Sequence, residues 1–179
     1  MDTMDAMEAI ETSKTMETKS VEEKFDLEED TQKGKYLTFI LGNETYGIGI
    51  ESVTEIIRLQ PITEVPELPE YIQGIINLRG KIIPVMDVRL RFNRELMEYN
   101  ERTCVVVIDV SETSIGLIVD GVSEVLSIPD SEIVDPPEVK KDGNKFIKSI
   151  GKVKDEVKLL LDCNKLITEE VMEDLEGLT

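Results

Sequence analysis

The chain has 179 residues, a formal net charge of −18 and an aromatic content of only 4%, with no tryptophan. A field this negative repels phosphate backbones and anionic lipid headgroups, so nucleic-acid binding and adhesion to a membrane surface are both disfavoured. The sequence contains no histidine, which excludes Ser-His-Asp and Cys-His catalysis in this chain.

The two cysteines, Cys104 and Cys163, form no CxxC pair and have no histidine with which to complete a zinc site. We expect two reduced thiols packed as small apolar groups, and the sequence leaves a disulfide between them open. The N-terminus lacks a basic start followed by an apolar stretch, and no apolar run approaches the roughly 18 residues that cross a bilayer. The sequence therefore predicts a cytoplasmic protein without a metal or cofactor.

Residues 1–34 mix Met, Thr, Glu and Lys and carry eleven acids against four lysines. Such a segment buries too little apolar surface to offset the entropy lost on ordering. We predict a disordered acidic tail over residues 1–34 and a folded domain over residues 35–179. Met4, Met7 and Ile10 fall at helical spacing, which would suit a helix induced by a partner.

From residue 35 onward, short runs rich in Val and Ile alternate with turn residues, a pattern typical of small antiparallel sheets. A short helical turn is expected at 51–53, and the charged stretch 138–145 is expected to be a loop. The predicted strands cover residues 36–41, 45–50, 54–57, 71–78, 81–86, 104–110, 114–119, 123–128, 146–153 and 156–161.

Three short helices are predicted from their capping residues. Asp87 and Asp162 each follow a predicted strand, and an aspartate in this position accepts hydrogen bonds from first-turn amides. The helix after Asp87 is expected to run through Phe92. The last helix is expected over residues 168–177, because Thr168 precedes two acids that favour a first turn.

The later part of the chain repeats the earlier part. Gly47–Ile56 matches Gly116–Val125 at a constant offset of 69, and Tyr71–Phe92 matches Phe146–Ile167 at an offset of 75 without a gap. The second match preserves the capping aspartates as well as the apolar positions. The sequence therefore predicts two copies of one small unit.

Each copy holds about five short strands, and small sheets protect their edges best by closing into barrels. Barrels this small bury more apolar surface when two of them pack together. We predict a mainly β fold of two five-stranded barrels, interleaved at their junction, over about residues 35–92 and 103–167. A pseudo-twofold pair of barrels has a groove at its junction, which is a common place for a binding site.

Three acidic pairs could in principle bind a divalent cation or perform acid–base chemistry, but in so acidic a chain they are more simply solvated faces. A small metal-dependent hydrolase using such acids is an alternative, as is a generic ligand-binding barrel. Gly47-Ile48-Gly49 lies inside a predicted strand, where glycine permits close packing or curvature. The acidic pairs are Glu51/Glu55, Asp120/Glu124 and Glu169/Glu170.

Asn77-Leu78-Arg79-Gly80-Lys81 places two cations and an amide at a turn between apolar strands. A guanidinium fixed at this turn can orient an acidic partner through bidentate contacts. An internal salt bridge that ties the two barrels together fits the same residues equally well, and the sequence does not choose between them.

The run Gly74–Arg89 (GIINLRGKIIPVMDVR) resembles the most recognisable segment of the CheW family of bacterial chemotaxis coupling proteins. Tyr46–Ile48 and Val119–Leu126 are similar to two further blocks of that family. The resemblance covers about residues 35–166 and omits the acidic tail. It implies two SH3-like barrels with a groove between them, in a protein that is not an enzyme.

The resemblance further implies an adaptor that binds the helical-hairpin tip of chemoreceptors in this groove and the regulatory domain of the histidine kinase CheA at its barrel ends. Such an adaptor is cytoplasmic and is recruited to membrane-associated receptor arrays. A CheW-like regulatory module of another signalling protein is the nearest alternative. Carried over by position, Arg79 would orient the receptor contact, and the apolar groove would be lined by Ile50, Val53, Ile56 and Val122.

Overall fold

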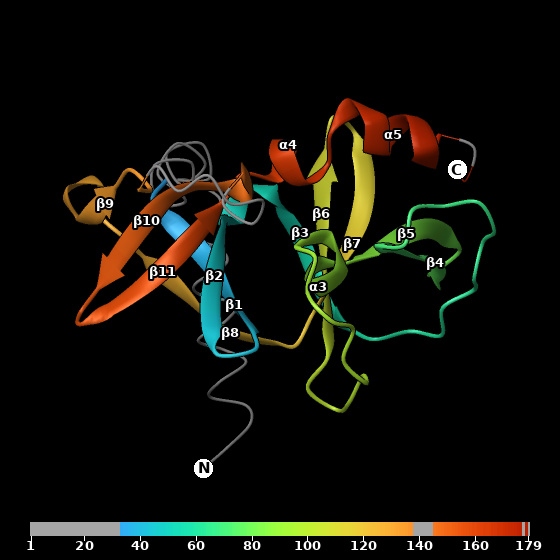
Figure 1. Ribbon diagram of the computed structural model, residues 1–179, viewed down its shortest axis with the longest axis horizontal. Coiled ribbons are helices and arrows are strands. Elements are labelled where there is room, and N and C mark those ends of the chain that lie inside the picture. Colours follow the sequence, from blue (N-terminus) through green and yellow to red (C-terminus); the bar gives the residue numbers. More distant parts are fainter. Residues whose placement is uncertain (1–32, 138–144, 177, 179) are drawn as a thin grey trace, which may run out of the picture. The chain divides into compact units, whose positions relative to one another are not determined.

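The computed structural model describes residues 33–137, 145–176 and 178, and two curved sheets dominate this part of the chain (Figure 1). Nearly all of the expected acidic tail and residues 138–144 of the expected loop lie outside the described residues. No helix in the described ranges is long and apolar enough to span a membrane. The mainly β prediction is confirmed.

We call the two sheets the first and the second sheet. The first has the strand order β8-β1-β2-β11-β10-β9 and the second has the order β3-β6-β7-β5-β4. The first sheet contains β1 (Lys35–Leu41), β2 (Glu44–Gly49), β8 (Gly121–Ser127), β9 (Ile133–Val134), β10 (Ile147–Val153) and β11 (Glu156–Leu161). The second contains β3 (Val53–Arg58), β4 (Ile72–Leu78), β5 (Lys81–Asp87), β6 (Cys104–Val110) and β7 (Thr113–Val119).

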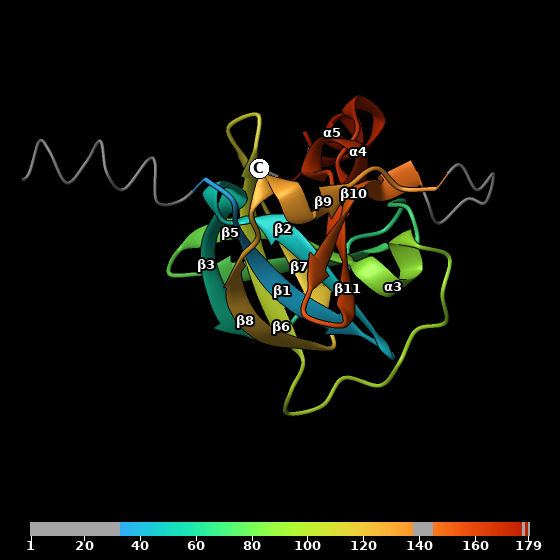
Figure 2. The same cartoon turned by 90° about the vertical axis from the view of Figure 1, so that its left-hand side faces the viewer.

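Each sheet takes strands from both sequence copies, as the mixed colours within each sheet show (Figures 1 and 2). In the first sheet, β1 and β2 of the first copy join β8, β10 and β11 of the second. In the second sheet, β6 and β7 of the second copy join β3, β4 and β5 of the first. The two strand orders are equivalent under the duplication, including the parallel pairs β2·β11 and β5·β7. The two copies thus exchange strands throughout both sheets, whereas the sequence predicted barrels that are interleaved only at their junction.

The helices begin where the capping residues predicted. The Asp87 carboxylate accepts a hydrogen bond from the amide of Leu90 at 3.2 Å, at the start of α3 (Val88–Arg91). The Asp162 carboxylate accepts from the amide of Asn164 at 2.9 Å, at the start of α4 (Cys163–Leu166). Each cap satisfies an amide that has no partner within its own helix.

A few elements differ from the predicted bounds. The last helix, α5 (Glu169–Leu175), ends before residue 177, and α3 ends one residue before Phe92. A 3₁₀ turn at Asp130–Glu132 and the two-residue strand β9 were not predicted, so the first sheet has six strands in place of five. Two residues carry too little pattern to indicate a strand, and only the pairing with β10 defines this one.

The larger core cluster joins the two sheets, and we call it the inter-sheet core. Ten of its strand residues form five pairs from equivalent positions of the two copies, separated by 69 residues. The two copies therefore pack against each other through equivalent faces of their strands. These pairs are Leu37/Val106, Phe39/Ile108, Leu41/Val110, Tyr46/Ile115 and Ile48/Leu117.

Strand β6 is buried on both faces. Val106 and Ile108 point into the inter-sheet core, whereas Val105 and Val107 belong to a smaller cluster with residues of β4, β5 and β7. This two-sided burial explains why the sequence of β6 reads as a continuous apolar run and not as an alternating one.

Two equivalent glycines allow the parallel strand pairs to pack closely. A Cβ on Gly116 would lie 2.6 Å from Val105 Cγ1 and 2.9 Å from Val85 Cγ1, and a Cβ on Gly47 would lie 2.9 Å from Leu160 Cδ2. Val85 and Leu160 are themselves equivalent in the duplication. Close packing at Gly47, which the sequence indicated, is confirmed, and the same constraint recurs in the other sheet.

Replacing Gly116 by alanine is expected to lower the free energy of unfolding by about 1–3 kcal/mol, the usual cost of overpacking a well-filled core. Urea denaturation followed by far-UV circular dichroism measures the change. Gly121→Ala is the matched control, because the nearest atom to a Cβ there, the Arg102 carbonyl oxygen, is 3.7 Å away. Equal stability of the Gly116→Ala and Gly121→Ala proteins would contradict this account.

Candidate functional site

Three of the predicted groove residues lie around the inter-sheet core. Ile50, Val53 and Val122 are half-buried and pack against that cluster. Ile50 belongs to the 3₁₀ turn Ile50–Ser52, which leads into β3. Val53 begins β3 and Val122 is the second residue of β8, and these two strands are outer strands of their sheets. The structure thus connects these three residues through one core cluster.

The fourth apolar residue, Ile56, is 44% exposed on β3. Its equivalent in the duplication, Val125 on β8, is 52% exposed. Sequence reasoning did not select Val125, although its pairing with Ile56 in the repeat was a signal that could have identified it. Large apolar side chains exposed at equivalent positions of two outer strands are suited to contact with an apolar partner surface.

Arg79 lies at the β4–β5 hairpin turn. Arg79 and Gly80 have φ values of 53° and 87°, and the Asn77 side-chain oxygen accepts a hydrogen bond from the Gly80 amide at 2.8 Å. Positive φ at both central residues is characteristic of a tight two-residue hairpin. The turn holds the arginine in a fixed place while its side chain remains 73% exposed.

The Arg79 guanidinium forms a salt bridge with Glu55 of β3, with Nη2 lying 2.5 Å and 2.7 Å from the two carboxylate oxygens. Both residues belong to the second sheet, so the bridge does not tie the two sheets together, and that part of the internal-bridge hypothesis is wrong. An exposed pair of this kind contributes roughly 0.2–1 kcal/mol to stability. The guanidinium is therefore oriented by Glu55 and still accessible to a partner.

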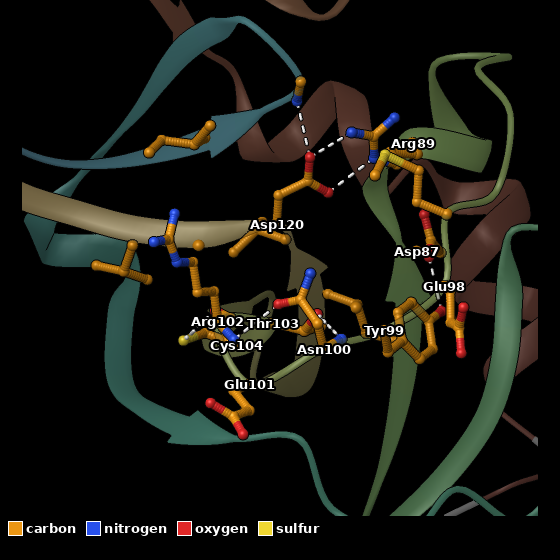
Figure 3. A pocket seen from close by; sticks show the side chains of 17 residues that line it. Asp87, Arg89, Glu98, Tyr99, Asn100, Glu101, Arg102, Thr103, Cys104 and Asp120 are labelled. Carbon is orange, nitrogen blue, oxygen red and sulfur yellow. Dashed lines mark hydrogen bonds and ion pairs between the residues drawn. The ribbon is translucent and has the colours of Figure 1, made fainter.

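A hollow of about 550 Å³ lies between the segment before β6 and the ends of β1, β7 and β8 (Figure 3). Val122 borders it; the other predicted groove residues do not. At its rim Arg89 pairs with Asp120, with Nε 2.7 Å from Oδ1, and the Gly42 amide donates to the same carboxylate at 2.7 Å. Burial alone would raise the pKa of Asp120, but these hydrogen bonds outweigh it and hold the pKa below its usual range.

A second carboxylate in this hollow, Asp87, is almost completely buried and accepts a hydrogen bond from the Tyr99 hydroxyl at 2.7 Å. Burial and this bond to the carboxylate raise the pKa of Tyr99, so the phenol stays protonated at neutral pH. Asp87 thus holds Tyr99, in the segment before β6, against the start of α3. Within the described ranges, no three Cys, Asp or Glu side chains converge to hold a metal ion.

Both cysteines are free thiols in this structure. Burial raises the pKa of Cys163 to about 11, so its reactive thiolate form is scarce at neutral pH. Cys163 packs against the inter-sheet core, and Cys104 does the same at the start of β6. The thiols therefore pack as small apolar groups, as the sequence indicated.

Comparison with known proteins places the chain in a family. Residues 35–171 match the family model of the CheW-like domain. The chain is 35% identical to the chemotaxis protein CheW of Klebsiella aerogenes, with 80% of this chain and 87% of the relative aligned. It is 34% identical to CheW of Bacillus subtilis, with 76% and 88% aligned.

Among solved structures, the chain is similar to the scaffolding protein TtCheW from Thermoanaerobacter tengcongensis, with a TM-score of 0.72 and 36% identity. The match covers 77% of this chain and 94% of that protein. It confirms the predicted pair of SH3-like barrels, which correspond to the first and second sheets. With the family model matched over residues 35–171 and this agreement in fold, the chain belongs to the CheW-like domain family.

Proposed function

We propose that this protein is a non-catalytic coupling adaptor of bacterial chemotaxis, which joins the cytoplasmic tips of chemoreceptors to the histidine kinase CheA. It works in the cytoplasm, at membrane-associated receptor arrays. Membership of the CheW-like family carries the proposal. The apolar side chains exposed at equivalent places on β3 and β8 support it, because an adaptor needs accessible surface for protein partners.

The receptor-binding groove of this proposal is lined by Ile50, Val53, Ile56 and Val122, and Val125 extends it on β8. Half-exposed aliphatic side chains supply affinity when the apolar face of a helix covers them. Their strands also carry charged residues, which set register and partner choice more than affinity. Arg79 is the cation best placed for this role, because its turn and Glu55 fix its position.

Coupling between partners requires that a change at one surface alters another. Val53 and Val122 pack directly against the inter-sheet core, to which both sheets contribute. A receptor helix that shifts these side chains therefore acts on both barrels at once. In this mechanism, receptor state biases the relative packing of the sheets, and the barrel ends transmit the bias to the kinase.

The hydrolase alternative requires acids that are free to act on a substrate or a cation. Glu55 is paired with Arg79, and Asp120 is paired with Arg89. These observations favour structural roles for two of the acids that the sequence had marked as candidates for chemistry.

A reconstitution experiment tests the adaptor role. Mixing the purified chain with a receptor signalling fragment and CheA is expected to stimulate CheA autophosphorylation, measured by phosphate incorporation. Omitting any one component should abolish the stimulation, since the adaptor acts only by joining the other two. Equal kinase activity with and without this chain would refute the proposal.

Val53→Glu is expected to abolish binding of the receptor fragment, because it places a carboxylate in an apolar contact that the partner must desolvate. Isothermal titration calorimetry measures the loss, and circular dichroism checks the fold. Ile56→Glu, at a more exposed position, should weaken binding without stressing the core. Val157→Glu is the control, an equal change at an exposed valine of β11. Unchanged affinity in a folded Val53→Glu protein would remove the groove model.

Arg79→Ala separates the two roles that the sequence left open. Because the Arg79–Glu55 pair is exposed, its loss should lower the free energy of unfolding by no more than about 1 kcal/mol. The same variant should weaken assembly with the receptor fragment and CheA, measured by co-sedimentation. If Arg79→Ala instead unfolds much of the protein, and the fraction that remains folded assembles normally, then Arg79 has a structural role alone.

A further inference from the structure

Arg91 of α3 is stacked between two aromatic rings that are equivalent in the duplication. Its guanidinium carbon lies 4.7 Å from the ring centroid of Tyr71 and 4.7 Å from that of Phe146. Its Nε donates a hydrogen bond to the carbonyl oxygen of Leu166 at 3.0 Å. Two rings and a carbonyl therefore fix the plane of this guanidinium, and its terminal nitrogens have no hydrogen bond to the described residues.

Arg91 has no salt bridge with any described residue, although it is half-buried. Three other arginines, Arg79, Arg89 and Arg94, each form a salt bridge with a carboxylate. Burial lowers the pKa of Arg91, and the nearby charge of Glu170 opposes this shift without reaching contact distance. A partly desolvated cation without a counterion favours the approach of an external anion.

Arg91 lines a shallow hollow of about 550 Å³ that also contains Lys145, Phe146, Lys165 and Glu169. The hollow has three cations and one acid. Three other hollows in the described part of the chain have as many acids as cations or more. The hollow around Arg91 is therefore locally positive in a protein whose net charge is −18.

We propose that this hollow binds an acidic segment of a partner protein, with a carboxylate paired to Arg91 and further acids held by Lys145 and Lys165. The site is distinct from the groove residues and goes beyond the coupling role. The negative surface around it repels an acidic partner elsewhere, so the segment is guided to this hollow. A fixed planar guanidinium suits bidentate pairing with a carboxylate, and the open shape suits a peptide on a surface.

The test uses the full chain and a fluorescein-labelled hexaglutamate peptide as the probe. Fluorescence anisotropy measures the affinity, and NMR shifts of the ¹⁵N-labelled protein, titrated with the same peptide without fluorescein, locate the site. The expected result is saturable binding with the largest shifts at the Phe146 amide, the amides of α4 and the Arg91 Nε–H. Shifts located elsewhere, or no saturable binding, would overturn the proposal.

Two variants and a control sharpen the test. Lys165→Glu reverses an exposed charge in the hollow and should weaken peptide binding at least about fivefold, because the pairing is electrostatic. Arg91→Lys keeps the charge but loses the planar fork, and should also weaken binding. Lys152→Glu changes the net charge equally on β10, outside the hollow, and should have little effect. Equal losses in Lys165→Glu and Lys152→Glu would show a general charge effect and refute the site.

Inorganic phosphate is the second probe. If phosphate saturates the same resonances while the peptide does not, the hollow is a phosphate site and the proposal fails. If the peptide binds and phosphate does not displace it, the acidic-segment assignment holds. Receptor-fragment binding by Lys165→Glu, measured in parallel, distinguishes failure of this site from failure of the coupling role.

Discussion

The structure depends on burial of apolar side chains between its two sheets. The strand residues of the inter-sheet core are contributed by equivalent positions of both sequence copies, so the two copies bury the same faces against each other. Full burial of a large aliphatic side chain contributes about 1.5–3 kcal/mol. Because each sheet contains strands of both copies, neither copy completes a sheet by itself. The pair of barrels is thus one folding unit, and the candidate groove residues Val53 and Val122 lie against its core.

The two copies differ in part of their interior and in their surface charge pairs. The interior of the second sheet is aliphatic, whereas the equivalent region of the first sheet contains the buried polar residues Thr38 and Lys158, each with a hydrogen-bond partner. The Arg79–Glu55 salt bridge has no counterpart at Lys154 and Glu124, the equivalent positions, where both side chains are exposed. The candidate groove residues Val53 and Ile56 have apolar equivalents in Val122 and Val125. The charges at positions 55 and 79 also recur in sign, but only one copy pairs them.

Most acids in the described part of the chain are exposed, and several that have hydrogen-bond partners have structural roles. Asp87 caps α3 and accepts from Tyr99, and Asp120 connects the β1–β2 turn to α3 through Arg89. The remaining charge gives a strongly negative surface, which limits the partners that can approach. Arg91 differs from the arginines that are paired with these acids. Two aromatic rings, and not a carboxylate, fix the position of its guanidinium.

The sequence by itself determined most strands, the capping aspartates, the duplication and the family, because these depend on local pattern and on similarity along the chain. It also marked Arg79 and the groove positions, whose binding role remains a prediction. Only the tertiary structure decided how the strands are exchanged, since the parallel pairing of β2 with β11 joins residues more than 100 apart. It also selected Glu55 as the partner of Arg79 and stacked Arg91 between Tyr71 and Phe146. In a chain with 38 acids, the pairing of charges depends on spatial proximity, which no local pattern records.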